Sequence, residues 1–71
     1  ATLEHDGEKV SLSVQGGSAP YTWTVHDTTL GNIISGGNAA SEVYERYHSG
    51  DNSIRVADSM GNVANAVIKQ P

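Results

Sequence analysis

This 71-residue chain contains three histidines, which are residues that could support metal or acid–base chemistry. His5, His26 and His48 lie on three separate stretches of the sequence. Zinc sites in small domains are usually built from closely spaced ligands, such as two histidines one helical turn apart. Because these three lack that spacing, we expect solvated surface side chains and not a convergent zinc or haem-iron site.

The sequence also shows no arrangement of residues suited to nucleophilic catalysis or to catalysis by a pair of carboxylates. Serine is abundant, but no Gly-x-Ser-x-Gly elbow occurs, and nothing orders a serine, a histidine and an acid into a triad. Glu42 and Glu45 would point to opposite faces of an extended segment, so they could not flank one bond. Gly16-Gly17 is followed by no lysine and opens no helix, so a turn with positive φ explains it better than a phosphate cradle. The sequence therefore predicts no enzyme and no cofactor.

Oxygen ligands gather in two turn-like stretches, where Asp51, Asp58 and Asn62 are weak candidates for calcium. The same residue types form Asx-turns, in which the side chain bonds to the backbone two residues on. We favour turns, because no glutamate stands at a loop-closing position to bind a cation through both oxygens. No metal is predicted.

The aromatic residues divide into a core candidate and an interface candidate. Trp23 shares its parity with Val25, which favours a side chain packed between sheets over one exposed for carbohydrate stacking. The expected core anchors are Trp23, Val14, Val25, Ile54 and Val56. Tyr44 and Tyr47 are three residues apart, with Arg46 between them, so in an extended segment they point to opposite faces and at least one tyrosine should be exposed. Since tyrosine and arginine are enriched at interfaces, Tyr44, Arg46 and Tyr47 form a candidate partner surface, with plain structural roles as the alternative.

Short alternating segments, separated by glycine, asparagine, serine and proline, must position these side chains. Four strands are expected, at 10–14, 21–25, 54–56 and 64–68. The stretch 30–34 reads as a brief strand or a plug, and 41–47 as an extended segment or a helical turn. Spacings of about ten residues are typical of a sandwich or barrel. The sequence predicts one all-β domain over residues 1–71.

Composition excludes several classes of partner. The formal net charge is −4 with only four lysines and arginines, so no basic stripe can follow a nucleic-acid backbone. There is no cysteine, which excludes disulfides. No apolar run approaches the length of a membrane span, so direct membrane insertion is not expected. Ala1 fits either a residue left by signal cleavage or a chain boundary.

The order of these segments resembles a known family. Leu12-Ser13-Val14-Gln15-Gly16-Gly17-Ser18-Ala19-Pro20-Tyr21-Thr22-Trp23 resembles the opening of bacterial immunoglobulin-like repeats of secreted and surface proteins. The later Gly50-Asp51-Asn52-x-Ile54-x-Val56 and Asp58-Ser59-x-Gly61-Asn62 stretches are similar too. The resemblance implies a small antiparallel immunoglobulin-like sandwich without a catalytic site. Only the short lead-in Ala1–Gly7 stands where the family has a further strand before the first alternating run, so one edge strand could be missing.

Two functions remain, both extracellular or at the cell surface. The first is a structural module of a bacterial fibre, pilus-like filament or adhesin, docked on a protein partner, on copies of itself or on a helix-bearing filament subunit. A short lead-in leaves a sheet edge that a partner would cover. The alternative is a module that recognises carbohydrate or protein through its loops and exposed tyrosines.

Overall fold

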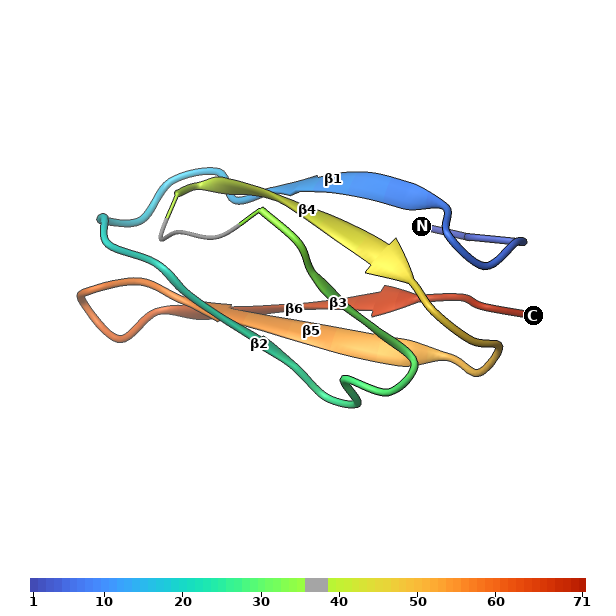
Figure 1. Cartoon of the computed structure of the whole chain (residues 1–71). Coiled ribbons are helices and arrows are strands. Elements are labelled where there is room, and N and C mark those ends of the chain that lie inside the picture. The colour runs from blue at the N-terminus through green and yellow to red at the C-terminus, as the bar shows by residue number, and fades with distance from the viewer. Residues whose placement is uncertain (36–38) are drawn as a thin grey trace.

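The computed structural model describes residues 1–35 and 39–71, and within them the regular elements are all strands. The strands are β1 (Lys9–Ser13), β2 (Thr22–Val25), β3 (Gly31–Ile33), β4 (Ser41–Arg46), β5 (Asn52–Ala57) and β6 (Val63–Ile68). They form two antiparallel three-stranded sheets, in the orders β1-β4-β3 and β2-β5-β6. The sheets pack against each other as the two layers of a small sandwich (Figure 1). The all-β fold class predicted from the alternating segments is confirmed.

The two ambiguous segments are both strands. The residues 30–34 contain β3, which pairs with β4 from Gly31↔Arg46 to Ile33↔Tyr44. The residues 41–47 contain β4, the central strand of its sheet, which pairs with β1 on its other side. A helical turn there would leave both neighbouring strands without hydrogen-bond partners, so the extended form is the one the sheet requires.

A narrow core lies between the sheets. Leu3, Tyr44, Ile54 and Ile68 are its buried centre, and five partly buried side chains pack against them: Val10, Leu12, Trp23, Val25 and Ile33. Of the expected core anchors, Ile54 and Val56 are buried, Trp23 and Val25 are partly buried against the centre, and Val14 is half-buried outside this cluster.

Gly31 permits the closest approach in the core. A Cβ atom on Gly31 would overlap the phenol of Tyr44 and would lie 2.6 Å from the carbonyl oxygen of Glu45. Because a backbone oxygen cannot move away without breaking the β3–β4 ladder, only glycine fits beside Tyr44.

The chain termini lie at the same end of the sandwich (Figure 1). There Thr2 forms a parallel bridge with Lys69. The Leu3 amide donates to the Lys69 carbonyl at 2.9 Å, and the Lys69 amide donates to the Ala1 carbonyl at 2.9 Å. The first residues, expected as a lead-in, thus add a short strand to the free edge of β6 and bury Leu3 in the core.

Candidate partner-docking site

Of the residues expected at a partner interface, only Tyr47 is on the surface. Tyr44 is fully buried and Arg46 is 5% exposed, whereas Tyr47 is 37% exposed. Tyr44 and Tyr47 do lie on opposite faces, as their odd spacing predicts. The face of β4 that points into the core, however, is the one that carries Glu42, Tyr44 and Arg46. The sequence-based prediction of a partner surface that includes Tyr44 and Arg46 therefore changes: neither side chain lies on the surface, because both are enclosed by their own chain.

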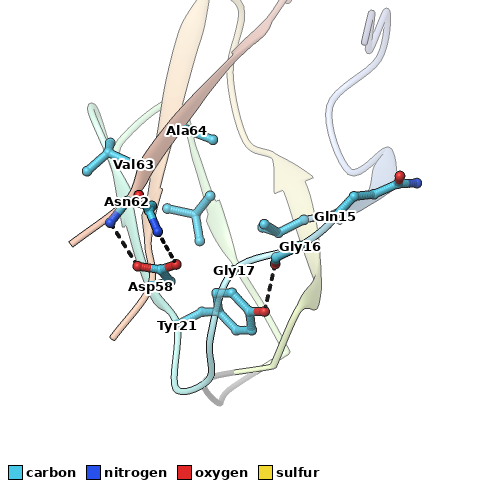
Figure 2. Close-up of a pocket in the computed structure, with 10 residues that line it drawn as sticks. Gln15, Gly16, Gly17, Tyr21, Asp58, Asn62, Val63 and Ala64 are labelled. Carbon is cyan, nitrogen blue, oxygen red and sulfur yellow. Dashed lines mark hydrogen bonds between the residues drawn. The ribbon is translucent and has the colours of Figure 1, made fainter. Parts of the chain in front are cut away.

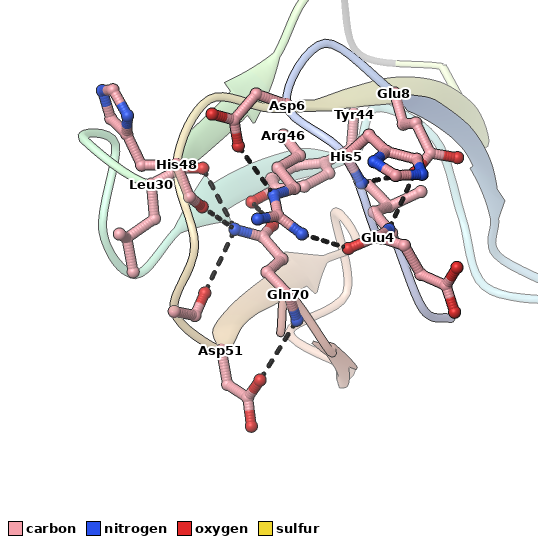
Figure 3. A network of polar contacts seen from close by, with 12 residues as sticks. Glu4, His5, Asp6, Glu8, Leu30, Tyr44, Arg46, His48, Asp51 and Gln70 are labelled. Atoms are coloured by element: carbon pink, nitrogen blue, oxygen red, sulfur yellow. Dashed lines mark hydrogen bonds and ion pairs between the residues drawn. The ribbon is translucent and has the colours of Figure 1, made fainter.

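A hydrogen-bonded network explains how this polar face is buried (Figure 3). The Tyr44 hydroxyl donates to Oε1 of Gln70 at 2.5 Å and accepts from Nδ2 of Asn52 at 2.9 Å. Gln70 Nε2 in turn donates to three carbonyl oxygens, at 2.8–3.1 Å, those of Leu30, His48 and Gly50. Burial raises the pKa of Tyr44, so the phenol keeps the proton it donates. These residues join the loops at one end of the sandwich and offer nothing to a ligand.

Arg46 holds the N-terminal segment against the same end. Its Nη1 donates to the Leu3 carbonyl at 2.6 Å, and its Nε pairs with Oδ1 of Asp6 at 3.0 Å (Figure 3). The guanidinium is thus a structural tie between β4 and the residues that carry Leu3 into the core.

Glu42 fixes the ends of the loop that precedes β4. Its carboxylate accepts from the Ser35 hydroxyl at 2.5 Å and from the Ala39 amide at 3.1 Å. The Ser35 hydroxyl also accepts from the Val43 amide at 2.8 Å. Glu45 lies across the strand on the other face, so the two acids do not form a catalytic pair.

The calcium candidates lie at opposite ends of β5 and serve as turn residues. Asp58 accepts hydrogen bonds from the amides of Met60 and Asn62 at 2.9 and 2.8 Å, from Nδ2 of Asn62 at 2.9 Å and from the Ser18 amide at 3.2 Å (Figure 2). The side-chain hydrogen bond from Asn62 is the main reason that the pKa of Asp58 is lowered. Because four donors already point at this carboxylate, a cation would have to displace them.

Asp51, at the other end of β5, accepts from the Gln70 amide at 3.1 Å, which lowers the pKa of Asp51. Its second oxygen faces Lys69 Nζ at 3.4 Å. All three histidines, His5, His26 and His48, are exposed. In the part of the chain that the structure describes, no three histidine or acidic side chains are placed to hold a metal ion. In the same residues, no helix is long and apolar enough to cross a membrane.

Two accessible hollows lie between the edge strands β1 and β6. One, of about 220 Å³, is lined by residues of both strands, with Trp23, Ile54 and Val56 from the other elements. The second, of about 250 Å³, continues past Gly17 and Tyr21 to the turn at Asp58 (Figure 2). The two hollows share four residues, which makes them one groove: Val14, Gln15, Val56 and Ala64. We call this continuous feature, from Leu12–Gln15 on one wall to Val63–Ala66 on the other, the seam groove.

Small side chains keep the seam groove open over the core. Ala64 and Ala66 point inward from β6, as the alternation predicts, yet they are too short to reach β1. Trp23 therefore lines the groove, while its Nε1 donates to the Ala39 carbonyl at 2.9 Å. The indole is both a core side chain and part of a surface that a partner could cover.

Both walls of the groove also present backbone groups that pair with none of the described strands. Gly50 donates to Gln70 and Asp58 donates to Asn62, which shows that even-numbered residues of β6 bond to β5. Because antiparallel pairs bond at alternate residues, the amides and carbonyls of Asn65 and Val67 point to the free edge. On β1, the Val14 amide bonds to Ala40, so Ser11 and Ser13 are the residues that face the free edge there.

Sequence reasoning missed the groove because it follows from strand order. Ala64 and Ala66 alternate along the strand expected at 64–68, and their small size is the one signal in the sequence that the sheets would not close over them. Which strands become edges depends on pairing between distant segments, and the chain alone does not state it.

Comparisons with protein-family models, with curated proteins and with solved structures found no match. What is shown is a small all-β protein of two three-stranded antiparallel sheets.

Proposed function

We propose that this chain is a non-enzymatic structural module of an extracellular bacterial assembly, such as a surface fibre, a pilus-like filament or an adhesin. In this proposal it docks on a protein partner through the seam groove. The observation that carries it is the groove itself, where Trp23, Ile54 and Val56 line an opening between two strand edges with unpaired backbone. A domain of this size has little core of its own, and covering the groove adds apolar burial and backbone hydrogen bonds together.

The strand order supports the family resemblance on which the extracellular setting rests. In the seven-strand immunoglobulin sandwich, sheets A-B-E-D and C-F-G face each other. If β1 to β6 are read as strands B to G, the two sheets here have the orders B-E-D and C-F-G. Ala1–Leu3, which bridges to Lys69 on the edge of β6, then lies in the position of strand A. A partner at the seam groove would lie along the same edge of β6.

The test is incorporation into the assembly. In the native host, fibres and surface material sheared from the cells should contain the chain. The variant Ala64→Glu places a charge on an exposed wall of the groove and should be lost from the sheared fraction. Thr24→Glu, exposed on β2, is the matched control and should be retained. A chain absent from the sheared material, or an Ala64→Glu variant incorporated like the wild type, would contradict the proposal.

Carbohydrate recognition is the second candidate, favoured by the ring of Trp23 in the seam groove. Against it, the tyrosine surface expected from the sequence is not part of the groove, because Tyr47 lines neither hollow and Tyr44 is buried. A glycan array decides between the two functions. Binding that disappears in a folded Trp23→Ala variant would favour recognition, and the absence of glycan binding is the result that the structural proposal expects.

A further inference from the structure

The free edge of β6 already carries one added strand, at the end where the termini lie. Ala1–Leu3 makes two backbone hydrogen bonds to Lys69 and places the Leu3 side chain among Tyr44, Ile54 and Ile68. Leu3 is only 5% exposed as a result. This segment shows how the space between the two sheets is filled along β6: by backbone pairing to an odd-numbered residue, with an apolar side chain turned inward.

From Lys69 back toward Val63, the described residues pair with β6 on one side only, through β5. Lys69, Val67 and Asn65 lie on one row, because alternate residues of an antiparallel strand face the same side. Among the described residues, Lys69 has its backbone partners in Ala1 and Leu3, whereas β6 pairs only with β5 from Val63 to Val67. The seam groove lies directly inside that unpaired stretch, with Ala64 and Ala66 on its wall.

The lining of the groove defines the chemistry of an occupant. Asp58 is the single charged residue among the described residues that line the two hollows, and its carboxylate already accepts four hydrogen bonds. A charged side chain entering the groove would be desolvated without a counter-charge. Uncharged apolar side chains, on the pattern of Leu3, are the ones that fit.

We infer that the seam groove is completed by an extended segment from a partner chain, which adds to β6 between the Asp58 turn and Ala1. The segment pairs with the outward backbone groups of Asn65 and Val67 and turns apolar side chains at alternate positions onto Trp23, Ile54 and Val56. At about 3.4 Å per residue, the unpaired stretch takes a strand of about five residues. This inference rests on the proposed function and adds that docking is by strand addition to one particular edge.

A synthetic peptide can probe the edge directly. The probe is a blocked seven-residue peptide of alternating threonine and valine, titrated into the ¹⁵N-labelled chain. We expect shifts at Ala64, Ala66 and the Trp23 indole, with amide exchange at Asn65 and Val67 slowed at least tenfold. The same peptide with proline at its central residue should give neither effect, because it lacks the central amide. Equal responses to both peptides would overturn strand addition.

Two proline variants locate the edge. Asn65→Pro removes an amide that points away from β5, so the sheet is kept while the bond to the peptide is lost. Ser11→Pro removes the corresponding outward amide on β1 and is the matched control. We expect Asn65→Pro to weaken peptide binding at least tenfold and Ser11→Pro to leave it unchanged. The reverse result would assign the occupant to β1 and overturn the inference.

Groove variants keep the two proposals separable and do not depend on proline being tolerated. If Ala64→Glu abolishes peptide binding and Thr24→Glu does not, the seam groove is the site. If Asn65→Pro binds peptide like the wild type while Ala64→Glu is lost from sheared fibres, strand addition is wrong and the proposed function stands. Self-association of the free chain that protects Asn65 and Val67 would also overturn the inference, because the occupant would then be a second copy.

Discussion

The hydroxyl of Tyr44 donates to Oε1 of Gln70 at 2.5 Å, which joins the centre of one sheet to the strand end of the other. The contact spans 26 residues of sequence and is fully buried on both sides. It closes the end of the sandwich where the termini lie, opposite the end at which the seam groove reaches the Asp58 turn.

Removing this hydroxyl should destabilise the fold. Tyr44→Phe leaves Gln70 Oε1 without its donor and takes one acceptor from Asn52 Nδ2. A buried polar group left unpaired costs about 1–3 kcal/mol, so urea unfolding should show a loss of that size. Tyr47→Phe, on an exposed side chain of the same segment, is the control and should change stability by less than about 0.5 kcal/mol. Equal stability of the two variants would show that the Tyr44 hydrogen bonds do not stabilise the fold.

Gly31→Ala should be more damaging than its size suggests. The new Cβ would overlap the Tyr44 phenol and lie 2.6 Å from the Glu45 carbonyl oxygen. Because part of the clash is with backbone, Tyr44→Phe should not rescue the variant. Circular dichroism and thermal melts of the single and double variants check this. A Gly31→Ala variant as stable as the wild type would show that β3 and β4 are not packed as described.

Arg46 should control the N-terminal strand. In Arg46→Ala the Leu3 carbonyl loses its charged donor, and hydrogen bonds to charged groups contribute about 1.5–3 kcal/mol. Amide exchange at Leu3 should accelerate more than exchange in β5. Arg55→Ala, which removes an exposed arginine from β5, is the matched control and should affect neither quantity. Amide exchange at Leu3 that is as slow in the Arg46→Ala variant as in the wild type would show that Arg46 does not hold the N-terminal segment in place.

Stability should fall in acid through the aspartates that organise turns. Hydrogen bonds lower the pKa of Asp27, Asp51 and Asp58 below the ordinary value of 3.8, from Thr29, Gln70 and Asn62 respectively. A lowered folded-state pKa means that the unfolded chain binds more protons in acid, so stability is complete above the unfolded value and is lost as pH falls through the folded one. Urea midpoints from pH 7 to pH 2 should show this decline. The Asp58→Asn variant should have a lower urea midpoint than the wild type at pH 7, and its midpoint should fall less as the pH is lowered. A midpoint that falls in parallel with that of the wild type would contradict the role of Asp58.

The strands could be predicted from the sequence, but the inward face of β4 could not. Alternation at 10–14, 21–25, 54–56 and 64–68 reflects burial of one side of each strand, which is a local property. In β4 the charged and polar residues Glu42 and Arg46 are inside, and Val43 is only half-buried on the other face. That choice is made by partners far along the chain, such as Leu3, 43 residues from Arg46.

The turn chemistry of the candidate site could also be predicted, whereas its open groove could not. Gly16 and Gly17 have φ of 79° and 80°, as the Gly-Gly pair indicates. A Cβ on Gly17 would lie 2.8 Å from Oδ2 of Asp58, so glycine also gives that carboxylate its room. The groove depends on β1 and β6 being edges of different sheets, which follows from the order of all six strands.

Hydrogen–deuterium exchange of the chain, free and within its sheared native assembly, tests the central claim most directly. The account predicts that the amides of Asn65 and Val67 exchange rapidly in the free chain and become protected at least tenfold in the assembly, while exchange at Ser11 changes little. Equal exchange at Asn65 and Val67 in both states would contradict it, because the edge of β6 would then remain uncovered wherever the protein works.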